Sequence, residues 1–150
     1  MIKSSALTSL LKKVIDNGIE AVFISQSSGE ILCMEGNNIN STCVDVASSM
    51  WFQYYQVGEE SLKNEKLNYL LIENDDSYVI MTYLFSYIIC MKSNKNIKLG
   101  MLKKHLEILR DNLNKMLVPF KELLIKKIKK DEKNNKNDND DDNDEKEQDN

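Results

Sequence analysis

Apolar residues recur at two spacings along this chain, and the changes of spacing mark the predicted helices and strands. Residues 4–17 carry leucine, valine and isoleucine at intervals of three and four, which is typical of a helix with one buried face. Serine at its start and Gly18 after it supply the usual helix boundaries. Residues 21–24 and 31–34 are apolar, and Ser27-Ser28-Gly29 between them predicts a β-hairpin turn.

The remaining pattern predicts a second helix, three strands and a long final helix. The second helix covers about Thr42 to Val57, with Thr42 and Asp45 as a capping box at its start. The predicted strands span residues 67–73, 78–85 and 86–92. Both faces of the middle strand are apolar, so the sheet should be covered on both sides. The final helix begins at Gly100, and Pro119 predicts a kink or a fresh turn within it.

These elements predict one α+β (α/β) domain, residues 1–128, built on a five-stranded antiparallel sheet with helices on both faces. Residues 131–150 hold ten acidic residues, three lysines and no aliphatic or aromatic side chain. We therefore predict a disordered acidic tail, rich in Asn, Asp and Lys, over residues 129–150. This tail carries −7 of charge and the preceding 130 residues carry +3, a mild basicity that disfavours a nucleic-acid binder.

The second predicted helix is apolar around more of its circumference than packing on one sheet requires. Its apolar arc exceeds roughly 180° on a helical wheel, whereas about 100–140° suffices for a helix lying on a sheet. The residues are Cys43, Val44, Val46, Ala47, Met50, Trp51, Phe52, Tyr54, Tyr55 and Val57. We predict that one side packs on its own sheet and the other on a partner chain. The alternative is a helix enclosed within a larger monomeric core.

Residues suited to catalysis or metal binding are sparse. His105, the single histidine, falls at the edge of the last helix's apolar stripe, where we expect a partly buried structural role. Cys33, Cys43 and Cys90 are widely spaced, which predicts free thiols at small core positions in a reducing cytosol. The single glycines form neither a phosphate-binding loop nor a dinucleotide fingerprint. We expect no enzyme activity, no metal site and no cofactor.

The sequence is not expected to contain a membrane-spanning helix, although its last predicted helix ends in a cluster of lysines. The longest apolar region, residues 79–91, is shorter than the roughly 20 residues that a span needs. Lysines cluster near the end of the final helix, at Lys121, Lys126, Lys127, Lys129 and Lys130. They favour the carboxyl end of a helix electrostatically, or they contact an acidic membrane or partner surface. Both interpretations stay open.

Six short segments, in their order and spacing, resemble the roadblock (dynein light chain roadblock) family. The nearest resemblance is to the small roadblock subunits of Ragulator-type, late endosomal and lysosomal adaptor complexes. The segments are Ala6-Leu7-Thr8, Gly29-Glu30-Ile31-Leu32, Ala47-Ser48-Ser49-Met50-Trp51, Leu70-Leu71-Ile72, Ile89-Cys90-Met91 and Gly100-Met101-Leu102-Lys103. Together they cover about Ser4 to Leu124. The acidic tail and the glycine-free turn at Phe85-Ser86 depart from the family pattern.

The resemblance implies a roadblock/profilin-like fold that pairs through its second helix and the adjacent strand, giving a continuous sheet across a dimer. The interface positions that it implies are Val44, Ala47, Ser48, Trp51, Tyr55, Leu67, Tyr69 and Leu71. On that basis, Trp51→Glu is expected to abolish pairing while leaving the strands formed.

The resemblance also implies a function. The chain would be a non-enzymatic scaffold or adaptor subunit that forms a heterodimer with a second roadblock subunit. The wider complex would include a lipidated anchor, recruit Rag-type GTPases to the cytoplasmic face of the late endosome or lysosome, and support TOR and MAP kinase signalling. Any guanine-nucleotide exchange would belong to the assembly, and this chain, also present in the cytosol, would meet the membrane only indirectly.

Two alternatives remain. One is a roadblock-type dynein light chain that links motor and cargo, which would share the fold and the interface. The other is a small enzyme or GTPase-regulating protein acting alone, with activity that depends on His105 or Glu73.

Overall fold

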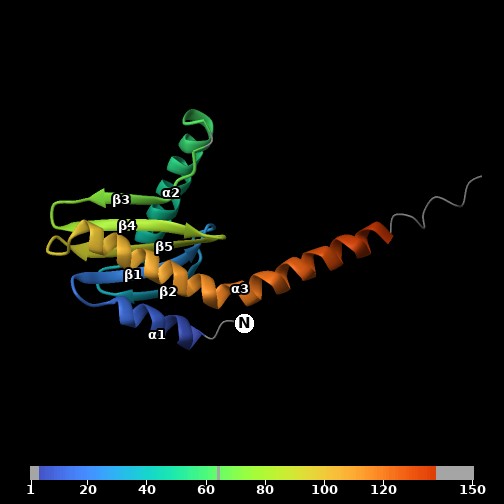
Figure 1. The fold of residues 1–150 in the computed structure, drawn as a ribbon, viewed down its shortest axis with the longest axis horizontal. Coiled ribbons are helices and arrows are strands. Elements are labelled where there is room, and N and C mark those ends of the chain that lie inside the picture. The colour runs from blue at the N-terminus through green and yellow to red at the C-terminus, as the bar shows by residue number, and fades with distance from the viewer. Residues whose placement is uncertain (1–3, 64, 138–150) are drawn as a thin grey trace, which may run out of the picture. The chain divides into compact units, whose positions relative to one another are not determined.

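The computed structural model describes residues 4–63 and 65–137, which form three helices and five strands (Figure 1). The elements are α1 (Ser4–Val14), β1 (Ile19–Gln26), β2 (Ile31–Gly36), α2 (Ser41–Ser61), β3 (Tyr69–Glu73), β4 (Ser77–Leu84), β5 (Tyr87–Asn94) and α3 (Leu99–Asn137). The predicted elements are all present, in the predicted order.

The five strands form one antiparallel sheet in the order β2-β1-β5-β4-β3. The chain from Ile2 to Asn114, which contains this sheet, is one compact unit. The central strand, β5, pairs with β1 along nearly the whole length of both, with Phe23 opposite Cys90. The strand β3 pairs only with β4 and therefore forms an edge of the sheet.

Apolar side chains fill both faces of the sheet, as the pattern of the middle strand predicts. On one face, Phe23, Met81 and Ile88 pack with the α2 residues Val44, Ala47 and Trp51. On the other, sheet residues such as Ile80, Ile89 and Met91 are buried together with one stripe of α1 and one of α3. The buried helical residues of this second layer are Leu7, Leu11, Leu102, Leu106, Leu109 and Leu113. The sheet is therefore covered by helices on both sides.

Helix α2 begins one residue before the predicted start. Its N-cap is Asn40, in extended conformation, and the Asn40 Oδ1 accepts a hydrogen bond of 3.0 Å from the backbone N–H of Cys43. The predicted capping box of Thr42 and Asp45 is therefore wrong, because Thr42 already lies inside the first turn. An asparagine side chain satisfies the unpaired N–H groups of a helix start as well as a threonine does.

Helix α3 continues through Pro119 to Asn137. The helix does not end at Pro119, so no fresh helix begins there, and a kink at this residue stays a prediction. Residues 129–137, which the composition assigned to a disordered tail, are also helical, because an existing helix extends at low cost through lysine-rich sequence. Residues 138–150 lie outside the described residues, and a domain boundary at residue 128 stays a prediction. From Lys115 onward the chain belongs to a second unit.

The end of β2 depends on a glycine that no other residue can replace without strain. Gly36 has φ +108° and pairs with Ala21 of β1. A Cβ atom at this position would lie 2.6 Å from the Ala21 Cα and would also collide with the Glu20 carbonyl oxygen. Both neighbours are backbone atoms, so the clash cannot be relieved by a side-chain rotation.

We expect Gly36→Ala to lower the free energy of unfolding by at least about 2 kcal/mol, through the positive φ and the backbone clash. Gly100→Ala is the matched control, since a Cβ there meets nothing within 4 Å. It should leave the stability unchanged or raise it by up to about 1 kcal/mol. Urea unfolding of both variants measures the difference, and equal stabilities would contradict this account of the β2 end.

Candidate protein-interaction surface

Helix α2 has two apolar sides, of which only one is buried in the described chain. Val44 and Trp51 face the sheet and are 0% and 1% exposed. Val46, Tyr54 and Val57 are 53%, 53% and 48% exposed. Their spacing of three to eight residues places them along one side of the helix. The chain's own sheet thus uses one half of the apolar arc, as predicted, and leaves the other half open.

An open groove of about 540 Å³ runs beside the first half of α2. Cys43, Val46 and Met50 line one wall, and the sheet residues Ile72, Val79 and Met81 are among those that line the rest. Tyr54 and Val57 continue the same helical stripe beyond the groove. The polar part of its lining consists of Asn38, Asn40, Thr42, Asn74 and Lys92. The groove is a predominantly apolar surface of the size that can receive side chains from a partner.

The β3 edge meets this groove. Ile72 of β3 lines the groove, whereas Tyr69 and Leu71 alternate to the other face of the strand and are 40% and 38% exposed. An edge strand presents a row of unpaired backbone N–H and C=O groups that can pair with a strand of another chain. The groove and the β3 edge together are called the α2–β3 surface below.

Aromatic packing holds α2 in place on the sheet. The Trp51 ring stacks on Tyr83 of β4, with ring centroids 6.0 Å apart and planes at 15°. Phe52 contacts the same tyrosine edge-on, at 6.5 Å and 79°. Further along the helix, a side-chain hydrogen bond to the Glu59 carboxylate raises the pKa of Tyr55. These contacts fix which side of α2 faces the sheet, and so which side remains open.

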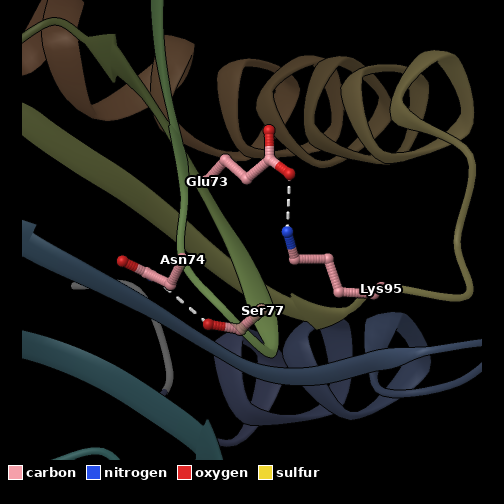
Figure 2. A network of polar contacts seen from close by, with 4 residues as sticks. All are labelled: Glu73, Asn74, Ser77 and Lys95. Carbon is pink, nitrogen blue, oxygen red and sulfur yellow. Dashed lines mark hydrogen bonds and ion pairs between the residues drawn. The ribbon is translucent and has the colours of Figure 1, made fainter.

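A polar network fixes the end of β3, where the strand reaches the groove (Figure 2). The Lys95 ammonium donates a hydrogen bond of 2.7 Å to the Glu73 carboxylate and lies 4.5 Å from the centre of the Tyr78 ring. The Asn74 amide donates one of 3.3 Å to the Ser77 hydroxyl across the β3–β4 turn. The hydrogen bond to Glu73 raises the pKa of Lys95. These contacts hold the end of β3 and the β3–β4 turn in place at the edge of the sheet.

The eight interface residues implied by the resemblance fall into three groups. Val44, Ala47, Ser48 and Trp51 are buried, Tyr55 and Leu67 are partly buried, and Tyr69 and Leu71 are exposed. Whether these residues contact a partner stays a prediction. The expectation for Trp51→Glu is corrected, however, since a charge at a core residue should disrupt the fold itself.

The sequence shows the residues on the open side of α2 as part of its apolar arc, but it does not show that they face away from the sheet. Val46, Met50 and Tyr54 share one helical stripe that is apolar over its whole length. The interface positions implied by the resemblance lie on the neighbouring stripe of the helix. Both stripes are apolar, so their spacing alone does not say which of the two faces the sheet.

The cysteines, the histidine and the acidic side chains were the other candidates for chemistry. The thiols are free, but only Cys33 and Cys90 are buried; Cys43 is exposed, so its expected core role is wrong. His105 is partly buried, as expected. Within residues 4–63 and 65–137, no three His, Cys, Asp or Glu side chains are grouped so that they could hold a metal ion. No helix in that part of the chain is long and apolar enough to cross a membrane.

Comparison with solved structures identifies the architecture. A Roadblock/LC7 domain from Streptomyces avermitilis superposes with a TM-score of 0.68 at 10% identity, covering 73% of this chain and 96% of that domain. The fold is that of a Roadblock/LC7 domain. MglB from Myxococcus xanthus gives a TM-score of 0.72 at 12% identity, over 79% of this chain and 92% of MglB.

A third roadblock structure, the gliding protein MglB from Thermus thermophilus, gives a TM-score of 0.64 at 9% identity, over 71% of this chain and 84% of that protein. No model of a known protein family matches the chain. The superpositions establish the roadblock fold. At identities this low they do not establish partners or pathway, which are inferred from the surface instead.

We predict that Cys43, which lines the groove, is the single fast-reacting thiol of the folded chain. Cys43 is exposed, whereas Cys33 is buried, and burial raises the pKa of Cys90 to about 12. Because the thiolate is the reactive form, we expect one fast-reacting thiol per folded chain at pH 8 with a disulfide reagent such as DTNB. Cys43→Ser should remove this fast phase and Cys33→Ser should retain it. Two or three equally fast thiols would contradict the burial of the other cysteines.

Proposed function

We propose that this chain is a non-enzymatic scaffold or adaptor subunit that works by pairing with a second roadblock-type subunit. The observation that carries the proposal is the junction of the apolar groove with the free edge of β3, which share Ile72. One partner of similar fold could cover the open side of α2 and add a strand to the sheet at the same time. Backbone pairing would supply affinity, and the groove would supply specificity.

The distribution of exposed apolar residues supports pairing at this place. Of the thirteen large apolar side chains exposed in the described residues, seven lie between Ser41 and Glu73: Val46, Phe52, Tyr54, Val57, Leu62, Tyr69 and Leu71. Burial of apolar surface yields about 25 cal/mol per Å². A specific interface buries roughly 1,200–2,000 Å² in total. The exposed apolar side chains of the described residues are therefore concentrated in the segment from α2 to β3, where Val46 lines the groove and Tyr69 and Leu71 lie on the opposite face of the edge strand.

A partner helix antiparallel to α2 would suit the shape of the surface. The groove lies beside the first half of α2, and the exposed Tyr54 and Val57 lie on the second half. An antiparallel helix of a related subunit would bring its second half alongside the groove. In Figure 1, α2 runs across the strand direction and continues beyond β3, so it could reach over a sheet extended from that edge.

The finer assignment rests on the six sequence segments that resemble small roadblock subunits of Ragulator-type complexes. We propose a Ragulator-like complex at the cytoplasmic face of the late endosome or lysosome, with a lipidated subunit as anchor. In it, this chain would help recruit Rag-type GTPases and support TOR and MAP kinase signalling. A roadblock neighbour, MglB, is known in a tetrameric arrangement, and its TM-score to this chain is 0.64 at 10% identity over 71% of this chain and 84% of MglB. That precedent supports assembly through roadblock surfaces.

Charge introduced on the open side of α2 should abolish pairing without unfolding the chain. Val46→Glu and Tyr54→Glu each place a carboxylate on the side that we assign to the partner, and burying it unpaired is costly. We expect at least about tenfold less co-purified partner. Ser49→Glu is the matched control, because Ser49 is exposed on the same helix away from the groove. Equal recovery with all three variants would contradict pairing through α2.

The partner's identity tests the finer function. Affinity purification of the tagged full chain after mild lysis, with mass spectrometry of the bound proteins, should recover a stoichiometric second roadblock protein, Rag-type GTPases and a lipidated subunit. Recovery with dynein chains would favour the motor light chain and overturn the signalling assignment while preserving the interface. A chain that purifies alone, with wild-type and variant behaving alike, would overturn the pairing proposal itself.

A further inference from the structure

The positive charge of this protein is concentrated in one segment, residues 115–137. This part of α3 carries eight lysines and three acidic residues, a net charge of +5. Residues 1–114, which contain the roadblock sheet, carry a net charge of −2, and residues 138–150 carry −7. The basic segment also begins at the boundary of the second compact unit, Lys115. Its charge is therefore a property of the second unit and not of the compact unit that contains the sheet.

Four exposed lysines form a regular row on this extension. Lys126, Lys129, Lys130 and Lys133 are exposed, at helical positions i, i+3, i+4 and i+7. Such positions lie on one side of a helix, and these span about 10 Å along its axis. None of the ion pairs among the described residues involves them. The four residues are called the lysine row below.

We propose that the lysine row binds the surface of an anionic lipid bilayer by electrostatic attraction. Each lysine near a negatively charged membrane surface strengthens binding by about fivefold, and the attraction decays within a Debye length of about 8 Å at physiological salt. A row of four on one side of a helix can approach that surface together. The contact needs no apolar insertion and no pocket.

A bilayer fits this row better than a nucleic acid or an acidic protein. Specific recognition of phosphate or carboxylate groups in fixed positions favours arginine, whose planar fork makes paired hydrogen bonds. The single arginine of the chain, Arg110, lies outside this segment. Lysine is a mobile point charge, which suits the diffuse charge of lipid headgroups.

The acidic residues that follow α3 should weaken the same contact. Residues 138–150 bring eight acidic side chains and one lysine directly after the lysine row. A segment of charge −7 repels an anionic surface and competes with it for the lysines. We therefore expect a chain that ends at Asn137 to bind anionic vesicles more tightly than the full chain.

The inference goes beyond pairing, and one consequence of it rests on the proposed function. In a Ragulator-like complex the lipid anchor belongs to another subunit. A single acyl chain gives only marginal membrane binding, and stable attachment takes a second signal such as a basic patch. The lysine row would supply that second signal, so this chain would touch the membrane directly and not only through its partners.

Vesicle flotation with the purified full chain tests the inference without any partner. The vesicles are phosphatidylcholine with 30% phosphatidylserine, compared with phosphatidylcholine alone, at low and physiological salt. The lysine-row variant changes Lys126, Lys129, Lys130 and Lys133 to Gln. The matched control changes the exposed Lys12, Lys13, Lys66 and Lys104 to Gln, and so removes the same charge from the domain. Circular dichroism of both variants checks that the helices remain.

We expect binding only to the anionic vesicles, reduced at least tenfold in the lysine-row variant and less than about twofold in the control. The chain ending at Asn137 should bind several-fold more tightly than the full chain. Equal losses in both quadruple variants, equal binding to neutral vesicles, or no binding by the chain ending at Asn137 would each overturn the proposal. So would a lysine-row variant that keeps vesicle binding but loses an acidic protein from the purified assembly.

The Val46→Glu variant separates the pairing proposal from the lipid-binding proposal. Val46→Glu lies outside the lysine row and should bind anionic vesicles as the unmodified chain does. Loss of partner with vesicle binding intact supports both proposals, whereas loss of vesicle binding in this variant would show that the row does not act alone and would overturn the inference.

Discussion

The packing of Trp51 against the sheet is the contact on which the rest of the structure depends. The indole is 1% exposed, stacks on Tyr83 and belongs to the cluster that joins α2 to Phe23, Met81 and Ile88. Once this ring is seated, the rotation of α2 about its axis is set. Val46, Tyr54 and Val57 are then turned away from the sheet, and the groove beside Met50 stays open. The burial of this one aromatic residue thus determines which side of α2 remains exposed.

The order and type of the elements could be predicted because each is encoded locally, by spacing and by turn residues such as Gly18 and Gly29. Helix ends were less certain: Asn40, Ser41 and Thr42 are all good N-caps, and only the observed hydrogen bond to Cys43 selects the first. The orientation of α2 could not be predicted, because two of its stripes are apolar and the choice between them depends on distant residues such as Phe23 and Tyr83. The same choice decides that Cys43 lies on the surface.

The charge pattern separates two kinds of interaction along one chain. The α2–β3 surface is mainly apolar, with its nearest charges held in the chain's own contacts, Glu73 with Lys95 and Glu20 with Lys92. The segment 115–137 carries instead a row of exposed lysines, none of which takes part in an ion pair among the described residues. Apolar burial depends on shape and responds little to salt, whereas attraction to a charged surface is long-ranged and weakened by salt. The two proposed contacts would therefore respond differently to salt.

The open edge of β3 has a consequence for how much of this protein a cell can hold. An unpaired edge strand beside an apolar groove is a template for non-specific association, and the charged pair at Glu73 protects only its end. Chains made in excess of a partner would keep this surface bare and be exposed to aggregation and to cellular quality control. Chains bound to a partner would be protected from aggregation and from cellular quality control. The abundance of one subunit would then follow the supply of the other, so that stoichiometry is maintained by selective survival instead of matched synthesis.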